Sequence, residues 1–352
     1  MQSRRQIVGS LLLLPALATP FRQARGQPNY KIAAQLRVHA RQRVIVDNDF
    51  SGDPDGLFQL AHQLLSPSAD VRLVVGSHLG MGDAFDPTPT QSENAVVLAR
   101  QLMSCLNLSS PPPVLAGKMG RFSFRSKSST EIAASRIVAE AMREDTSIPL
   151  FYLAGAGLTD LAQAYSLEPR ISKKLVLIWI GGPEHADLAS AVPARSGIEY
   201  NTKIDLGAAM EIFNNSDMEI WQVPRDVYRT MLISYSELDI RLKSSGRLGQ
   251  FLRDQIARII TLGENSPPPY DVGLGETYIL GDSPLVTLTA LQSSFEADSS
   301  SSSYVVIPTP SFTERGSYGP SIRRRKMRVY RSIDTRLTFE DMFMKFSAIE
   351  KD

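Results

Sequence analysis

Four aspartates that could hold a metal ion or work as acid and base lie close together near the start of the chain, at positions 47, 49, 53 and 55. Carboxylates massed in one turn repel one another, so the folded protein needs a compensating cation or strong hydrogen bonds. Oxygen ligands of this kind suit Ca²⁺ or Mg²⁺ better than zinc. The alternative is that these aspartates only cap a helix and face solvent. The cost of four like charges together makes that the weaker interpretation.

The residues around these aspartates predict a strand, an acidic loop and a helix, in that order. Residues 44–46 form a short β-branched run typical of a buried strand. Turn-forming residues fill positions 48–56. After them, apolar residues recur at helical spacing: Leu57, Leu60, Ala61, Leu64 and Leu65. In open α/β sheets ligands bind at the carboxyl ends of strands, where this acidic loop would lie.

The acidic loop resembles the signature of the inosine-uridine-preferring nucleoside hydrolase family, which runs strand, D-x-D-P-G-x-D-D, helix. Residues 47–49 match the D-x-D, whereas Asp53 and Asp55 are separated by Pro54. The resemblance implies that Asp49 is both the catalytic base and a metal ligand. It further implies that Asp53 contacts ribose and that Asp55 is a metal ligand, although the pattern does not assign these two roles uniquely.

A second cluster, Glu199-Tyr200-Asn201, stands where the family has E-F-N. The resemblance implies that Glu199 and Asn201 hydrogen-bond ribose hydroxyls, a suitable task for one acceptor and one amide. A capped loop is the alternative. The strand at 149–154 runs into Gly155, near the place of a backbone carbonyl that binds calcium in the family. A plain strand-to-helix turn is the alternative there.

A third cluster, residues 281–284, stands where the family has H-D-P-L. Asp282 is thereby expected to be the last metal ligand, but glycine replaces the histidine. That histidine is suited to proton transfer near the departing base. We expect the acid to be absent or supplied by His185, in the loop after the apolar strand at 174–180, with His78 next. His78 follows the strand at 71–76 and could instead face the ribose, or be a loop histidine bonded to backbone.

Strands and helices alternate throughout, which predicts a three-layer α/β sandwich with a mostly parallel, Rossmann-like central sheet, like that of a nucleoside hydrolase. A chain of 352 residues is long enough for one large domain, which we place at 43–350. Residues 305–307 are expected to form an edge strand and 327–330 a closing strand, with a hairpin at 334–336. One helical region is expected over 236–262.

The N-terminus has the layout of a secretory signal. Two arginines at 4 and 5 precede an apolar run, and Ala16-Leu17-Ala18 follows as a cleavage-like site. We predict a twin-arginine-like signal over 1–27, a linker over 28–42, and a periplasmic or secreted protein. The apolar run is too short to span a bilayer, and no cysteine follows it to carry a lipid. The alternative is a short buried N-terminal helix.

The composition is ordinary for a soluble globular enzyme. Hydrophobic residues make up 43% of the chain, charged residues 21%, and the net charge is +1. Bulk charge thus favours neither nucleic acid nor a membrane surface. A single cysteine, Cys105, excludes an internal disulfide and is expected to be a small buried hydrophobe. The expected partner is a ribonucleoside or another riboside, with no nucleic acid and no stable membrane anchor; a homo-oligomer is left open.

The expected activity is hydrolysis of the N-glycosidic bond of a ribonucleoside to base and ribose, with a Ca²⁺-bound water that Asp49 deprotonates. A HAD-like phosphohydrolase is one alternative, because residues 47–49 also fit its D-x-D nucleophile loop. Against it, a D-x-T continuation is missing and residues 199–201 have no place there. A secreted nucleoside- or sugar-binding protein that has lost turnover is the other alternative, and Gly281 favours it.

Overall fold

The computed structural model describes residues 38–123, 132–188, 197–265, 275–293, 301–323 and 325–349. The predicted signal at 1–27 and the first part of the predicted linker lie outside these residues. Export and the domain boundaries therefore stay predictions. Over the ranges described, no helix is both long enough and apolar enough to cross a membrane.

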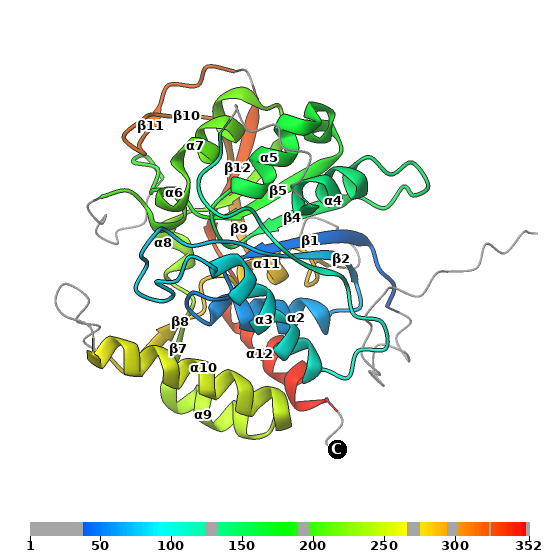
Figure 1. Cartoon of the computed structure of the whole chain (residues 1–352), viewed down its shortest axis with the longest axis vertical. Coiled ribbons are helices and arrows are strands. Elements are labelled where there is room, and N and C mark those ends of the chain that lie inside the picture. The colour runs from blue at the N-terminus through cyan, green and yellow to red at the C-terminus, as the bar shows by residue number, and fades with distance from the viewer. Residues whose placement is uncertain are drawn as a thin grey trace, which may run out of the picture.

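Within the described ranges, eight strands form the central sheet, in the order β3-β2-β1-β4-β5-β6-β12-β9 (Figure 1). Every neighbouring pair is parallel except β12 and the edge strand β9, which are antiparallel. The predicted mostly parallel sheet and its edge strand are confirmed. The strands are β1 (Gln42–Asn48), β2 (Ala69–Gly76), β3 (Val114–Ala116), β4 (Leu150–Ala154), β5 (Leu175–Ile180), β6 (Glu219–Val223), β9 (Ser303–Pro308) and β12 (Lys326–Ser332).

Helices cover both faces of the sheet, so the predicted three layers are also confirmed (Figure 1). On one face lie α2 (Asp55–Leu64), α3 (Gln91–Ser104), α11 (Pro284–Thr287) and α12 (Thr335–Ser347), and α9 (Tyr235–Lys243) and α10 (Gly246–Asn265) pack against α12 in the same hydrophobic core. The other face packs against α4 (Ile132–Ala141), α5 (Thr159–Leu167), η1 (Pro169–Lys173), α7 (Leu206–Met210) and η2 (Glu211–Asn215). The short helices α6 (Tyr200–Ile204) and α8 (Arg225–Tyr228) lie in the connections after β5 and β6.

Strand β1 shows why the core has two halves. All seven of its residues are buried, and successive side chains of a strand point to opposite faces. Val44 and Val46 accordingly enter the core under α2, whereas Ile45 enters the core under α4 and α5. Burying one such aliphatic side chain contributes roughly 1.5–3 kcal/mol, so this strand is firmly placed on both sides.

The order in which successive strands are added to the sheet reverses beside β1. Strands β2 and β3 extend the sheet on one side of β1, and β4, β5 and β6 extend it on the other. Asp47, near the end of β1, is paired with Val75 of β2 and Ala154 of β4. Ligands of open α/β sheets bind in the crevice at such a reversal, so the acidic loop that follows β1 stands at the expected place.

Two smaller ladders lie outside the central sheet, and neither was predicted. They pair β7 (Leu232–Ser234) with β8 (Thr277–Ile279), and β10 (Ser311–Phe312) with β11 (Tyr318–Gly319). The expected hairpin at 334–336 is wrong. Asp334 instead caps α12 by accepting a hydrogen bond from the backbone N–H of Leu337 at 2.8 Å.

A buried polar cluster joins α2 to α12 on the side of the helices that faces the core. His62 is fully buried, and its Nε2 lies 2.7 Å from Oδ2 of Asp341. Lys345 donates to that same carboxylate and to the hydroxyl of Ser66. Burial lowers the pKa of His62 to about 4 and outweighs the attraction of Asp341. The imidazole is therefore neutral in the folded protein at neutral pH.

This cluster predicts a loss of stability in mild acid. Because the folded pKa of His62 lies below the unfolded value of 6.5, its contribution is fully present above pH 6.5 and is lost as the pH falls toward 4. Between pH 7 and pH 5 the loss should be about 2 kcal/mol. His62→Gln keeps an amide that can donate to Asp341 but cannot titrate, so it should lose less over the same interval. Urea unfolding of both proteins at the two pH values measures this difference, and equal losses would contradict the assignment.

Candidate functional site

The acidic residues that the sequence places far apart meet at the carboxyl end of β1. The amide nitrogen of Asn48 donates to Oδ2 of Asp282 at 2.8 Å, across 234 residues of sequence. The backbone N–H of Asp282 in turn donates to Oδ2 of Asp55 at 3.1 Å. Two of the three aspartates predicted to bind metal, Asp55 and Asp282, are thereby linked through the backbone N–H of Asp282, and Asp49 follows Asn48 in the chain.

Asn48 organises this arrangement, and the sequence analysis missed it. Its side-chain oxygen accepts a hydrogen bond from the backbone N–H of Asp49 at 2.9 Å. Its amide also packs against two glycines. A Cβ atom at Gly56 would lie 2.7 Å from the amide nitrogen, and one at Gly155 would lie closer still. The signal that could have identified Asn48 is an amide between two aspartates, able to donate to one carboxylate while accepting from the backbone.

Asp47 belongs to the framework of the sheet. It is fully buried, and its two oxygens accept hydrogen bonds from the hydroxyls of Ser77 and Tyr152. Burial raises its pKa to about 6, although these two hydrogen bonds act in the opposite direction. Its carboxylate therefore holds the ends of β1, β2 and β4 together and is not available to a substrate.

The other aspartates stand in an environment that disfavours their charge. Burial raises the pKa of Asp49 and Asp55 well above the usual value, and the negative charge of Asp282 raises both further. Burial also raises the pKa of Asp282 to about 7. A hard divalent cation would reverse this cost, and the donors are all oxygens, which fits calcium. In the described part of the chain no three acidic, histidine or cysteine side chains already converge on one metal position, so calcium stays a prediction.

Asp53 lies between Asp49 and Asp55 in the sequence and adds its negative charge to theirs. Its Oδ1 accepts a hydrogen bond from the backbone N–H of Asp55 at 3.2 Å, and its side chain is half-buried. Its negative charge contributes to the raised pKa of both Asp49 and Asp55. Asp53 is thus part of the same cluster and keeps some contact with solvent, as a residue that meets a substrate must.

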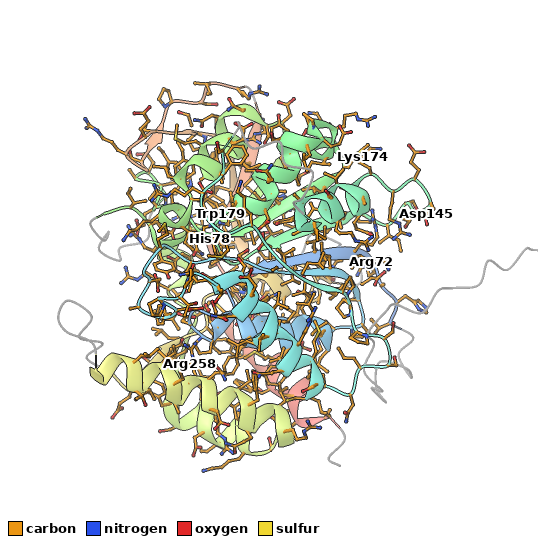
Figure 2. The ribbon with its side chains drawn as sticks, viewed as in Figure 1. Arg72, His78, Asp145, Lys174, Trp179 and Arg258 are labelled. Carbon is orange, nitrogen blue, oxygen red and sulfur yellow. The ribbon has the colours of Figure 1, made fainter. Side chains whose placement is uncertain are left out.

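Asn201 joins the ends of β4 and β5. Its side-chain nitrogen donates to the carbonyl oxygens of Gly155 at 2.9 Å and Ile180 at 2.7 Å. Both amide hydrogens are thereby used, and Oδ1 is the atom that could accept a substrate hydroxyl. The carbonyl of Gly155 has a second lone pair for the predicted metal ion. The turn that carries it is fixed by Trp179 of β5, whose indole N–H donates to Ala156 at 2.9 Å (Figure 2).

Glu199 is fully buried and caps α6. Its carboxylate accepts hydrogen bonds from the backbone N–H groups of Gly182, Asn201 and Thr202 and from the hydroxyls of Thr202 and Tyr228, at 2.8–3.1 Å. About four lone-pair sites are available on a carboxylate, so its capacity is filled. The predicted contact with ribose would require one donor to leave, and Tyr228 is the one on another helix.

Tyr228 lies beside Gly281, the position where the family has a histidine. The sequence gave no signal for this tyrosine. A Cβ atom at Gly281 would lie 3.4 Å from Cδ2 of Tyr228 and 3.3 Å from Oδ2 of Asp55. The aromatic ring thus lines the space beside Gly281. Burial, and then the charge of Glu199, raises the pKa of Tyr228. Its hydroxyl therefore stays protonated at neutral pH and can donate a hydrogen bond.

His78, which is labelled in Figure 2, has both ring nitrogens close to polar groups of the protein. Nδ1 lies 2.6 Å from the carbonyl oxygen of Leu79, and Nε2 lies 3.1 Å from the hydroxyl of Thr159. Thr159 in turn donates to Asp205 at 2.8 Å. This agrees with the interpretation of a loop histidine bonded to backbone. A role toward the substrate would require these contacts to break, and it stays a prediction.

His185 lies in the connection after β5, as expected, and contacts β6 and β11. Its Nε2 lies 2.8 Å from Oε1 of Gln222, and its ring stacks on Tyr318 with centroids 4.3 Å apart. Burial lowers its pKa, against the effect of Gln222. The neutral imidazole donates through Nε2 and has Nδ1 as an acceptor. A role as the acid would require it to take up a proton first, which is unfavourable at neutral pH.

Tyr200 lies near the acidic residues. The residue is 40% exposed, and its hydroxyl donates to Oδ2 of Asp83 at 2.8 Å. Burial of the hydroxyl and the nearby charge of Asp49 raise its pKa. The contact joins α6 to the segment 79–90, which follows β2, so that these two parts of the chain meet beside the acidic residues.

The sequence of this chain matches no family model and no curated protein. Its structure is similar to several solved ones. An inosine-uridine-preferring nucleoside hydrolase from Bacillus anthracis shares 16% identity with a TM-score of 0.61, covering 88% of this chain and 100% of its own. A purine-preferring ribonucleoside hydrolase from Gardnerella vaginalis shares 17% identity with a TM-score of 0.59, covering 88% and 99%. A plant nucleoside hydrolase shares 17% identity with a TM-score of 0.61, covering 88% of this chain and 99% of its own.

These structures define the fold of the chain as that of the nucleoside hydrolases, over nearly the whole length of those proteins. They include an inosine-uridine-preferring enzyme, the kind whose motifs the acidic loop and the two later clusters resemble. At 12–17% identity the likeness establishes the fold, and activity has to be argued from the site.

Proposed function

We propose that this protein hydrolyses the N-glycosidic bond of a ribonucleoside, releasing the base and ribose. The observation that carries the proposal is the link from Asn48 to Asp282, and from Asp282 to Asp55, within a nucleoside hydrolase fold. It brings the first and third sequence clusters together at the carboxyl end of β1. Asn201 of the second cluster joins them there through Gly155, against whose backbone Asn48 also packs.

Calcium is part of the proposal, because oxygen donors surround a buried cluster of like charges. Asp49, Asp55, Asp282 and the carbonyl of Gly155 are the groups that would hold it. When bound, the ion would supply positive charge that favours ionised carboxylates and lowers the pKa of water. Burial, and then the negative charge of neighbouring carboxylates, raises the pKa of all three, so a bound cation would stabilise their ionised forms.

The side chains divide the remaining work. Asp49 is the proposed base, since an ionised carboxylate can accept a proton from the attacking water. Oδ1 of Asn201 is placed to accept a hydrogen bond from a ribose hydroxyl, because both hydrogens of its amide are already used. Asp53, which is half-buried, is the proposed second contact for the sugar. Glu199 and His78 join the sugar site only if substrate displaces their present partners.

The lack of a group that protonates the departing base predicts a strong preference for substrates with good leaving groups. Gly281 has no side chain with which to donate a proton, and the lowered pKa of His185 leaves little of its acid form at neutral pH. A p-nitrophenyl riboside, whose leaving group needs no proton, should therefore be cleaved faster than inosine or uridine, by about 10²-fold or more. If no acid is present, His185→Ala should leave all three rates unchanged, whereas if His185 supplies the acid, the substitution should slow only the two nucleosides. Rates for the three substrates that are equal and unaffected by His185→Ala would contradict the assignment.

The two rival activities make different predictions. A phosphohydrolase would need Asp47 or Asp49 as its nucleophile, and Asp47 is buried with both oxygens bonded, which disfavours that alternative. A binding protein without turnover is favoured by Gly281 and by the filled acceptor sites of Glu199. Incubation with a panel of ribonucleosides and assay for reducing sugar tests the proposal directly. Ribose released with free base supports it, phosphate released from phosphomonoesters supports the first rival, and binding without ribose supports the second.

A further inference from the structure

Arg258 connects two loops that frame the acidic site. It lies on α10 (Figure 2) and is partly buried. Its Nη2 donates to the carbonyl of Gly52 at 2.6 Å and lies 3.5 Å from that of Ser51, and its Nη1 donates to the carbonyl of Phe85 at 3.2 Å. Ser51 and Gly52 belong to the acidic loop after β1, whereas Phe85 belongs to the segment 79–90 after β2.

The contact with the acidic loop falls at its tightest point. The backbone N–H of Gly52 donates to the carbonyl of Asp49 at 2.7 Å, which closes a turn between the proposed base and Asp53. A Cβ atom at Gly52 would lie 2.9 Å from a methyl carbon of Leu79. Three contacts therefore hold the backbone at Gly52: the hydrogen bond of the turn, the packing of Leu79 and the hydrogen bonds from Arg258.

The other loop has a framework of its own, and Arg258 adds a tie to the acidic loop beside the contact of Leu79 with Gly52. Gln91, at the start of α3, accepts from the backbone N–H of Leu79 at 3.0 Å and donates to the carbonyls of Gly80 and Asp86 at 3.0 and 2.7 Å. These bonds hold the segment to its own helix. The guanidinium adds a connection from the segment to a different element, α10, and through it to Gly52.

The guanidinium also places a positive charge beside the carboxylates without forming an ion pair with them. Asp86 and Asp53 attract it, while burial lowers its pKa. Charge alone would make Arg258 compete with a bound cation, whereas its hydrogen bonds would keep the aspartates in place for one. The two effects on calcium affinity have opposite signs, so an experiment can separate them.

We propose that Arg258 is a positioning residue, which holds the acidic loop and the segment 79–90 as one unit and thereby prepares Asp49 and Asp53 for metal and substrate. The role toward calcium rests on the proposed function, but the mechanical role does not. Lysine at this position keeps the charge but lacks the planar fork that reaches two loops at once. Arg258→Lys therefore isolates positioning from charge.

The test uses the full chain in four forms: wild type, Arg258→Lys, Arg258→Gln and the control Arg253→Lys. Arg253 lies on the same helix and bonds Gln250 at 2.6 Å, away from both loops. Hydrogen exchange measured without metal should speed up in residues 50–53 and 79–87 together in both Arg258 variants. Calcium affinity measured by calorimetry should fall by about tenfold or more in Arg258→Lys, while Arg253→Lys resembles wild type in both measurements.

Faster exchange in one loop only, or in neither, would overturn the proposal. So would a calcium affinity that is unchanged in Arg258→Lys and raised in Arg258→Gln, because that pattern is the effect of charge alone. If wild-type protein binds no calcium, the metal part of the proposed function fails, and the exchange measurement still decides whether Arg258 couples the two loops.

Discussion

Asp49→Asn is expected to reduce turnover of a ribonucleoside by about 10²- to 10⁴-fold, the range associated with loss of a general base. Asparagine has almost the same shape but cannot accept the proton of the attacking water. Its backbone N–H can still donate to Asn48, as that of Asp49 does at 2.9 Å, so the turn should survive. The measurement is kcat with the best nucleoside of the panel, together with the unfolding midpoint to show that the variant is folded.

Asp187→Asn provides a control with the same change of charge. Asp187 is exposed in the connection after β5 and has no part in the proposed chemistry, so its variant should keep the wild-type rate. If Asp49→Asn also keeps a rate near that of wild type, Asp49 is not the base, and the carboxylates of Asp53 and Asp55 become the candidates.

Removal of calcium is expected to abolish turnover and to destabilise the fold. Asp49 and Asp282 are buried, Asp55 is half-buried, and the pKa values of all three are raised, so a bound cation would offset the cost of holding these charges close together. At a calcium concentration a thousand times the Kd, the free energy of unfolding should rise by about 4 kcal/mol. Chelation followed by activity assay and thermal unfolding, with calcium restored at the end, measures both effects.

Asp282→Asn tests the same site without chelation. The substitution keeps an oxygen that can accept from Asn48 but removes one charge, so calcium affinity should fall by about tenfold or more. Protein that is free of metal and still hydrolyses its substrate would contradict the calcium assignment. Unchanged affinity in Asp282→Asn would show that the ion, if it binds, lies elsewhere.

Much of the fold could be predicted because its signals are local. The β-branched run of β1 and the helical spacing of Leu57, Leu60 and Leu64 each report burial within a few residues of chain. The order of such elements then determined a parallel sheet with helices on both faces. The same locality allowed the acidic loop to be placed at the end of the first strand.

The errors arose where the decisive contact is distant or where two elements adjoin. Residues 236–262 are helical as predicted, but the sequence analysis did not separate α9 from α10, which begins at Gly246, whose positive φ of 55° suits a break. The final segment forms α12, since Phe339, Phe343 and Phe346 are buried at helical spacing. A resemblance to a closing hairpin concealed this pattern.

The sequence analysis named many residues of the candidate site but predicted few of the contacts between them. No local signal shows that Tyr152 and Ser77 occupy both oxygens of Asp47, or that five donors fill the carboxylate of Glu199. Each of these facts depends on chain segments that meet only in the folded protein. Asn48, Tyr228 and Arg258 were missed for the same reason, because their partners lie far along the chain.

The most direct test of the central claim is a crystal structure of the protein soaked with calcium and ribose. The account predicts one calcium ion with oxygen ligands from Asp49, Asp55, Asp282 and the carbonyl of Gly155, at roughly 2.3–2.6 Å. It also predicts a ribose hydroxyl within hydrogen-bond distance of Oδ1 of Asn201. Calcium bound elsewhere, or ribose bound away from these residues while the acidic loop is unchanged, would contradict it.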